Sequence, residues 1–434
     1  MNPSRRDGLT DKSRGDLWYY SFLPNNIAGG ATSTLIPLFA FLLGAGAAEV
    51  GIIAASSSIA SVPAFMLWGG LSDRLGRRRA FIVVAFLGMA ISLGLMTISQ
   101  GIVELYLANL LMGALTSAGI AGTVLIMETS ERSEWPEKLA FFSQIGGIGF
   151  ILGLAIGGSW LAIFSGPWGQ NGSMRALFLA GTMLSLLSAL MAWRWIRDPD
   201  ISVKRSSISI PEHLYLAVER VKYLPHRLLH YFDFSNDSER RHSLSPTLRS
   251  YYVCVLLQFA GFTGFYAMFP IFLAGPMRLD GSQVFAVFIA SQVVSAAIYS
   301  KVGRWITRVG ARRAQIVGAT ARIALFPTFL TLALFPTTLP FVFMAALLLH
   351  GLIGASWAII NVSGSTIVSR LAPKDGRAQT FGLYNAVQGV GAIAGPLFVG
   401  FTTELLGYEG GFILSSLLIL GGVLLLTNLR MDES

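Results

Sequence analysis

Apolar segments long enough to cross a lipid bilayer recur along the whole chain of 434 residues. A transmembrane helix needs about 20 predominantly apolar residues, and twelve runs reach roughly that length. Because these runs take up most of the chain, we expect an all-α polytopic membrane protein with twelve transmembrane helices. The runs are residues 17–43, 50–71, 80–99, 103–127, 139–164, 174–196, 249–274, 282–303, 314–335, 339–361, 378–403 and 408–429.

The composition excludes an ordinary soluble enzyme. Hydrophobic residues make up 53% of the chain and charged residues only 13%, whereas soluble domains carry about 25% charged residues. The single cysteine, Cys254, permits neither an intrachain disulfide nor a cysteine-based zinc site. The sequence contains no P-loop, no zinc motif and no Ser/His/Asp arrangement with supporting context. We therefore expect no enzymatic activity, no cofactor and no metal.

The basic residues define the expected topology. Of the 32 Lys and Arg residues, 29 fall in the two tails and in alternate loops, all on one side of the predicted membrane. Arg175 and Arg278 lie on the opposite side, and Arg322 lies within a predicted helix. Positive charge collects in cytoplasmic loops, so both termini are predicted to be cytoplasmic in an inner or plasma membrane. The net charge of +9 therefore reports topology, and no nucleic-acid partner is expected.

The halves of the sequence resemble each other. The segment Gly69–Arg79 after the second run corresponds to Gly303–Arg313 after the eighth, at an offset of 234 residues. A glycine series in the fifth run has a counterpart in the eleventh, which indicates a duplicated unit of six helices. We expect these positions to let helices pack closely and bend, with a substrate site between the halves near the membrane midplane. The series are Gly149, Gly153 and Gly157, and Gly391, Gly395 and Pro396.

This repeat defines the predicted domain organisation. Two pseudo-symmetric six-helix bundles are joined by a long polar stretch, which contains a segment with the pattern of an amphipathic helix on the cytoplasmic leaflet. Near the start of the chain, Trp18, Tyr19 and Tyr20 are expected at the membrane interface. The predicted parts are an N-terminal tail at 1–16, the bundles at 17–196 and 249–429, the cytoplasmic central loop at 197–248 and a C-terminal tail at 430–434.

The loop after the second run resembles the signature loop of the major facilitator superfamily, Gly-x-Leu-x-Asp-Arg-x-Gly-Arg-Arg. The matching positions include Gly69, Asp73, Arg74, Gly76, Arg77 and Arg78. The resemblance implies a twelve-helix secondary transporter. It also implies that this loop acts as a conformational latch, with Asp73 bonded to neighbouring arginines and to the start of the eleventh helix near 375–377. In the second copy Thr307 replaces the acid, so a weaker latch is expected there.

Two departures from the superfamily's drug/proton exporters affect whether we expect transport to be coupled to protons. Those exporters tend to carry an arginine inside the fourth helix and a Gly-Pro pair in the fifth. Here the run 103–127 has no arginine, and Leu154 follows Gly153. Acidic residues also fall near predicted helix ends, away from mid-span where carboxylate proton relays usually lie. These features argue against a proton antiporter of that type and against carboxylate-driven coupling through the centre, and leave acids at the helix ends as the alternative for ion coupling.

Uncharged polar and aromatic groups are the expected lining of the substrate cavity. His350, Trp357 and Asn361 share one helical face, and other polar groups are scattered through helices that line the cavity in the superfamily. Each could instead form an interhelical hydrogen bond. Such a lining suits a neutral or amphipathic solute better than a small cation. The candidate cavity residues are Asn26, Gln144, Gln258, Tyr266, Gln292, His350, Trp357, Asn361, Asn385 and Gln388.

Two central ionisable groups allow more than one interpretation. We expect Arg322 to snorkel or to pair with a helix end, and contact with a substrate anion is the alternative. His350 can be a hydrogen-bonded packing residue, or it can handle substrate or a proton.

The sequence thus predicts a secondary transporter that moves a small organic solute by rocking-bundle alternating access. Export of apolar or amphipathic compounds is the leading hypothesis. A nutrient facilitator or importer for sugars or organic acids is the alternative, followed by a lipid flippase and a non-transporting membrane sensor. The expected partners are the solute, the lipid bilayer and a proton or other coupling ion, and the protein is expected to be a monomer.

Overall fold

The computed structural model describes residues 17–131, 133–198, 245–334, 338–373 and 377–429. These ranges are helical and contain no strand, which confirms the all-α fold. Most of the central loop, with its predicted amphipathic helix, lies outside the described residues, as do both tails. The elements are η1 (Leu17–Ser21), α2 (Phe22–Ser33), α3 (Leu35–Leu42), α4 (Ala47–Leu75), α5 (Arg78–Ile98), α6 (Ile102–Thr116), η2 (Ser117–Ile120), α7 (Ala121–Thr129), α8 (Trp135–Trp195), α11 (Pro246–Ala274), α12 (Gly281–Val309), α13 (Ala311–Leu334), α14 (Leu339–Leu371) and α15 (Arg377–Asn428).

The helices have the length and surface of membrane spans. Among the described residues, nine helical segments are long and apolar enough to cross a bilayer. Large apolar side chains lie on their outer surfaces, such as Leu405 at 80% exposure and Val103 at 69%. Apolar surface on this scale is stable only against lipid or another apolar partner. The chain is therefore an integral membrane protein.

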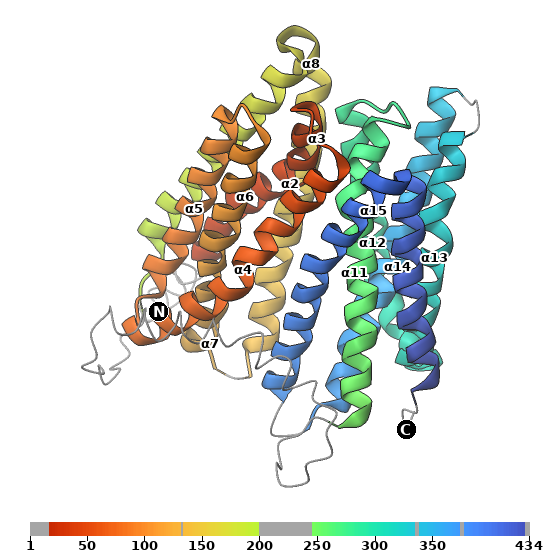
Figure 1. Cartoon of the computed structure of the whole chain (residues 1–434). Helices are drawn as coiled ribbons and strands as arrows, with labels where there is room; N and C mark the ends of the chain where they lie inside the picture. The colour runs from red at the N-terminus through yellow and green to blue at the C-terminus, as the bar shows by residue number, and fades with distance from the viewer. Residues whose placement is uncertain (1–16, 132, 199–244, 335–337, 374–376, 430–434) are drawn as a thin grey trace, which may run out of the picture. The chain divides into compact units, whose positions relative to one another are not determined.

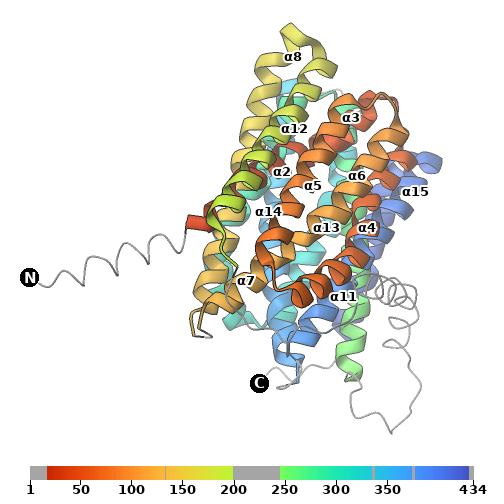
Figure 2. The same cartoon turned by 90° about the vertical axis from the view of Figure 1, so that its left-hand side faces the viewer.

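Two of the helical segments are about twice as long as one bilayer crossing. The α8 and α15 spans cover 59 and 49 residues, against the roughly 20 residues that one crossing needs. Each is broken by a glycine with positive φ, Gly169 at 69° and Gly407 at 74°, a conformation that glycine adopts without steric penalty. Figures 1 and 2 both show α8 reversing its direction at one end. These reversals agree with the expected alternation of spans, while the count of twelve remains a prediction.

The contacts divide the chain into two compact units. The first comprises residues 1–36 and 59–219, and the second comprises 37–58 and 220–434. Helix α4 therefore contributes its first residues to the second unit and the remainder to the first. The boundaries of the two predicted six-helix bundles remain predictions.

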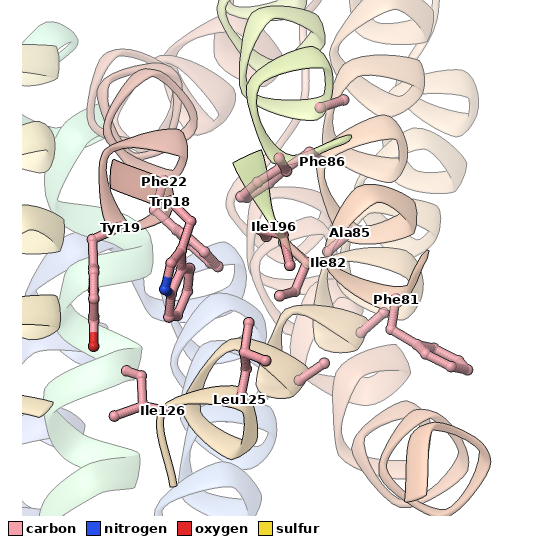
Figure 3. Packing of buried hydrophobic residues seen from close by; sticks show 14 of the residues in the cluster. Trp18, Tyr19, Phe22, Phe81, Ile82, Ala85, Phe86, Leu125, Ile126 and Ile196 are labelled. Carbon is pink, nitrogen blue, oxygen red and sulfur yellow. The ribbon is translucent and has the colours of Figure 1, made fainter. Parts of the chain in front are cut away.

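An aromatic and aliphatic cluster forms part of the core of the first unit (Figure 3). Trp18 and Tyr19 belong to it, with exposures of only 7% and 2%. Trp18 stacks on Tyr19 with ring centroids 4.3 Å apart, and both rings contact Phe142 of α8. Aromatic side chains of α8 therefore bury these two residues, and their predicted position at the membrane interface stays a prediction. Tyr20 is exposed at 44%, as an interfacial residue would be.

Glycines bring α2 against α8 in the first unit and α11 against α15 in the second. A Cβ added to Gly149 would lie 2.7 Å from Cβ of Asn26, and one added to Gly153 would collide with the backbone of Ile27. In the second unit, a Cβ at Gly391 would lie 2.8 Å from Cβ of Phe259. Gly395 likewise has no room for a side chain, because Ala260 lies against it, whereas Gly157 is simply buried. The same device therefore holds corresponding helix pairs in both units.

Candidate functional site

Arg78 organises the polar loop between α4 and α5. Its Nε and Nη2 donate to the two carboxylate oxygens of Glu128 at 2.9 and 2.5 Å, and its Nη1 lies 2.9 Å from Oδ1 of Asp73. Nη1 also donates to Ser72 Oγ at 2.7 Å. The Arg78 side chain is only 5% exposed, whereas that of Asp73 is 65% exposed. One buried guanidinium therefore joins α4, α5 and α7 through charge-assisted hydrogen bonds.

The backbone turns sharply just before Arg78. Gly76 has φ of 61°, a conformation that favours glycine, and this allows α5 to begin two residues later. Gly69 has open space where a Cβ would be, so the expected close helix approach is not seen there in the described structure. Arg74 and Arg77 are exposed.

The acid that binds Arg78 most closely was not selected from the sequence. Glu128 lies 50 residues further along the chain, near the end of α7. Its place near the cytoplasmic end of the fourth apolar run was the available signal, because the Gly69–Arg78 loop lies on the same predicted side. The predicted partner segment at 375–377 lies mainly outside the described residues. The contact of this loop with the eleventh helix therefore stays a prediction.

The corresponding loop of the second unit is built differently. Thr307 is exposed, and its hydroxyl donates to the carbonyl oxygen of Arg304 at 2.7 Å. Arg312 donates to the carbonyl oxygens of Leu426 and Thr427, at 3.0 Å for Leu426. A basic side chain on these last carbonyls stabilises the end of α15. An arginine is the donor in both loops. Arg312 binds backbone carbonyl oxygens at a helix end, whereas Arg78 binds two carboxylates.

The beginning of α4 lies against α15 within the second unit. A Cβ at Gly51 would collide with the carbonyl oxygen of Pro396 and lie 3.1 Å from Cα of Gly400. The Glu404 carboxylate accepts from the backbone N–H of Ala48 at 3.3 Å, at the amino-terminal end of α4 where negative charge is favourable. Glycines and one carboxylate therefore hold this crossing of two helices together.

Arg322 lies at the centre of a second polar group, inside the second unit. It is 0% exposed, so the expected snorkelling to a membrane surface is wrong. Its Nε donates to Ser356 Oγ at 2.9 Å, and Nη2 lies 3.4 Å from the carbonyl oxygen of Ile353. The guanidinium carbon lies 4.3 Å from the centre of the Phe262 ring and 5.4 Å from that of Trp357. Aromatic faces of α11 and α14 thus enclose the charge in place of water.

His350 is close to the same aromatic group and is 1% exposed. Its Nδ1 lies 2.8 Å from the carbonyl oxygen of Val287. A carbonyl oxygen only accepts, so Nδ1 carries the proton, and Nε2 has no partner in the described structure. The imidazole contacts the rings of Tyr266, Phe269 and Phe288, with centroids 4.9 to 5.9 Å away. His350 is therefore a packed, hydrogen-bonded residue with one free nitrogen.

The structure brings some of the predicted cavity residues together. Tyr266 contacts both Arg322 and His350, and Trp357 contacts Arg322. Gln258 lies elsewhere in the same unit, 1% exposed, and its Oε1 accepts from Gln315 Nε2 at 2.9 Å. Tyr266 and Trp357 are partly exposed, so the aromatic group has an accessible edge.

The other predicted cavity residues are dispersed. Asn26 donates to the carbonyl oxygen of Phe22 at 2.8 Å and packs beside Gly149. Gln144 is exposed and lines a hollow of about 790 Å³ with Tyr19 and Lys138 in the first unit. Four residues of the second unit are partly or fully exposed, and these are Gln292, Asn361, Asn385 and Gln388. The side chain of Gln388 lies within hydrogen-bonding reach of the Tyr384 hydroxyl.

The carboxylates of the described residues lie away from the middle of the spans. Glu104 and Glu137 begin helices, Asp73 and Glu128 end them, and Glu404 lies close to the Gly407 break. The mid-membrane polar groups of the described chain are therefore amides, hydroxyls, His350 and Arg322.

Comparison with known proteins assigns the chain to a family. The sequence matches the Major Facilitator Superfamily over residues 21–356 and, in a second overlapping match, over residues 251–433. Multidrug resistance protein MdtG of Rahnella is 22% identical over 408 residues, covering 91% of this chain and 88% of that protein. The tetracycline resistance protein of class B from Escherichia coli is 26% identical over 178 residues, and this match spans only 40% of its length.

A solved structure has the same fold. The nucleoside transporter NupG aligns over 96% of this chain and 98% of its own, with a TM-score of 0.65 and 17% sequence identity. At this identity the likeness concerns the fold alone. The family match covers most of the sequence, and its members are transporters of small solutes. The chain therefore belongs to the Major Facilitator Superfamily and is an integral membrane transporter, not an enzyme.

Proposed function

We propose that the protein exports apolar or amphipathic organic compounds by alternating access. The observation that carries this proposal is the accessible aromatic edge at Phe259, Tyr266 and Trp357, deep in the helices of the second unit. Aromatic rings bind apolar and planar groups, and pockets for organic ligands are mostly apolar with a few polar groups. Small cations would require carboxylates, which the described mid-span positions lack.

The names of two relatives support export. One is named for tetracycline resistance and one for multidrug resistance, and a transporter confers resistance when it carries the drug out of the cell. These names describe the relatives, and their low identities leave the solute of this chain to be measured.

Alternating access needs contacts that form in one state and break in another. Arg78, Asp73 and Glu128 fix the polar loop at the proposed cytoplasmic end, and the contact of this loop with the start of the eleventh helix is the one we expect to form in one state and break in the other. Prolines inside α4, α11, α13 and α15 bend helices, which suits moving bundles better than a static channel.

The proposed orientation places both termini in the cytoplasm of an inner or plasma membrane. The distribution of Lys and Arg supports it. Single cysteines introduced at Ser4 and at Gln100 in a Cys254→Ala background test it with a membrane-impermeant thiol reagent on intact cells. We expect labelling at Gln100 only, and labelling at Ser4 alone would reverse the orientation.

Flux into inside-out proteoliposomes tests the direction and the class of solute. The panel contains tetracycline as an amphipathic compound, uridine as a nucleoside, and glucose. We expect uptake of tetracycline above that of empty liposomes and above that of an Asp73→Asn variant. Uptake confined to uridine or glucose would replace export of amphipathic compounds with nutrient transport.

The accessible amides are the observation that favours nutrient transport as the second candidate. Asn361, Asn385 and Gln388 offer both donors and acceptors, which suits the hydroxyl groups of a sugar or nucleoside. The same flux panel decides between the two functions, because the two predicted solutes are measured side by side.

A further inference from the structure

Arg322 is a permanent charge held at the middle of a membrane span. A guanidinium stays protonated in proteins, and this one is 0% exposed. Eleven residues separate it from the start of α13 at Ala311, which places it about 16 Å along the helix at 1.5 Å per residue. Charges at this depth are costly and generally mark function.

The neighbours of Arg322 satisfy only part of its hydrogen-bonding capacity. Ser356 Oγ accepts at 2.9 Å and the Ile353 carbonyl oxygen lies at 3.4 Å, while Nη1 has no partner. Both acceptors are neutral, and so is the Tyr266 hydroxyl, which also lies within hydrogen-bonding reach of the guanidinium. Arg78, which is also buried, is paired with two carboxylates, whereas no acidic side chain of the described residues pairs with Arg322. The charge therefore lacks the counterion that buried charges need.

Aromatic rings hold the guanidinium without neutralising it. Phe262 lies 4.3 Å from the guanidinium carbon, Trp357 at 5.4 Å and Tyr266 at 5.8 Å, all within the range of cation–π attraction. Phe262 is buried, whereas Trp357 and Tyr266 are partly exposed. Two of the side chains that contact the buried cation are thus themselves accessible in part.

We propose that Arg322 recognises an anionic group of the transported solute, namely a carboxylate attached to an apolar or aromatic body. Tyr266 and Trp357 bind the body, and their movement opens Nη1 to the carboxylate. The planar guanidinium fork matches a carboxylate through two parallel hydrogen bonds. This inference rests on the proposed function and adds a preference, among its amphipathic solutes, for those that carry a carboxylate.

A purely structural role predicts different behaviour. If Arg322 only held α13 against α14, its removal would lower the melting temperature and reduce the affinity for every ligand alike. If it is an uncompensated charge kept for recognition, an apolar replacement relieves an electrostatic cost, since apolar residues often stabilise sites of buried charge. In that case Arg322→Met keeps or raises the melting temperature but loses the preference for a carboxylate over its amide.

The experiment compares matched ligands on purified full-length protein in lipid nanodiscs. The probes are 2-naphthylacetate and decanoate, each paired with its neutral amide of nearly the same shape. Isothermal titration gives affinity, and thermal unfolding gives stability, for the wild type and for Arg322→Met and Arg322→Lys. Arg304→Met is the matched control, because Arg304 is exposed on α12.

The wild type and Arg304→Met should prefer at least one carboxylate over its amide by about tenfold or more, as two charge-assisted bonds predict. Arg322→Met should bind acid and amide equally while melting at or above the wild-type temperature. Arg322→Lys should keep part of the preference. Equal binding of acid and amide by the wild type, or no binding of either pair, would overturn the proposal. A preference that survives Arg322→Met would do the same.

Sodium acetate and sodium chloride separate an organic anion from a simple inorganic one. Neither salt should stabilise the wild type as much as 2-naphthylacetate at equal concentration, and stabilisation by chloride alone would overturn recognition of a solute carboxylate. Failure of the export proposal gives a different pattern, in which the carboxylate preference persists in nanodiscs but tetracycline flux into inside-out vesicles is absent.

Discussion

Arg78 and Glu128 form a two-bond pair, with Nε to Oε2 at 2.9 Å and Nη2 to Oε1 at 2.5 Å. The guanidinium is 5% exposed and the carboxylate 23%, so water screens the pair weakly. The pair connects the start of α5 to the end of α7 and leaves Nη1 for Asp73. The Arg78 side chain therefore both stabilises the fold of the first unit and fixes the conformation of its polar loop.

Removing Arg78 should destabilise the protein substantially. Arg78→Met leaves the partly buried Glu128 carboxylate without its cation, and breaking a buried pair from one side costs about 3 kcal/mol. Glu128→Gln keeps an acceptor and should cost less. Thermal and chemical unfolding in detergent measure both variants.

The exposed pair of Lys138 and Glu134 provides the control. Its atoms lie 2.9 Å apart, with side chains 30% and 49% exposed, so Glu134→Gln should change stability by less than about 1 kcal/mol. A similar loss of unfolding free energy in Glu134→Gln and Arg78→Met would contradict the role that burial has for the Arg78 pair.

Asp73→Asn should reduce transport far more than Thr307→Asn. The first change removes the Arg78 ion pair, and because the Asp73 side chain is 65% exposed, water limits the energy of this pair to about 1 kcal/mol. If this energy favours one state of the transport cycle, its loss shifts the population by about fivefold. Thr307 is uncharged and donates to the carbonyl oxygen of Arg304 within its own helix. Initial rates of flux in proteoliposomes provide the measurement, and near-wild-type rates in both variants would refute the latch.

Gly51→Ala should disturb the crossing of α4 and α15. The added Cβ would overlap the carbonyl oxygen of Pro396, and forced overpacking costs about 1 to 3 kcal/mol. Gly70→Ala is the matched control in the same helix, because nothing lies within 4 Å of its added Cβ. Replacing a helical glycine with alanine there should be neutral or stabilising. Melting temperatures and flux rates distinguish the two variants, and equal behaviour would contradict the close contact.

The apolar runs and the signature loop were sufficient to predict the all-α membrane fold and the family. Both are encoded locally, in the length of each run and in the spacing of Gly69, Asp73 and Gly76. The partners of individual polar groups were not encoded locally. Glu128 reaches Arg78 across 50 residues, and Arg322 is enclosed by rings of α11 and α14, so tertiary packing decides what each one contacts.

Which predicted cavity residues come together also depends on tertiary packing. Tyr266, His350 and Trp357 do gather around one aromatic group, in which Tyr266 of α11 contacts both His350 and Arg322, and Trp357 of α14 contacts Arg322. Gln258 has an equally suggestive sequence position, yet it accepts a hydrogen bond from Gln315 in a buried network. Helical periodicity gives the face of a residue but does not identify the helix that will cover that face.

Gln258→Leu should therefore affect stability and leave solute binding unchanged. Its Oε1 accepts from Gln315, whose own Oε1 accepts from the hydroxyl of Tyr251 at 2.8 Å. Removing one member leaves a buried donor without a partner, which costs about 1 to 3 kcal/mol. Asn385→Leu is the control for an exposed amide on α15. We expect a lower melting temperature with an unchanged KM for Gln258→Leu, and a raised KM at normal stability would place Gln258 in the cavity instead.

His350→Gln should leave the response of transport to a pH gradient unchanged. Nδ1–H of His350 donates to the Val287 carbonyl oxygen, and three aromatic rings surround the imidazole. A proton on Nε2 would add a second cation beside the aromatic group that already holds Arg322, with no carboxylate of the described residues paired there to offset it. Glutamine can still donate to Val287, so the variant preserves the fold. Flux is measured with and without an imposed gradient, for the wild type, His350→Gln and the ring-filling His350→Phe. The gradient should change all three rates by the same factor, because any proton coupling would then use the acids at the helix ends. Loss of the response in both variants at unchanged downhill flux would make His350 the proton carrier.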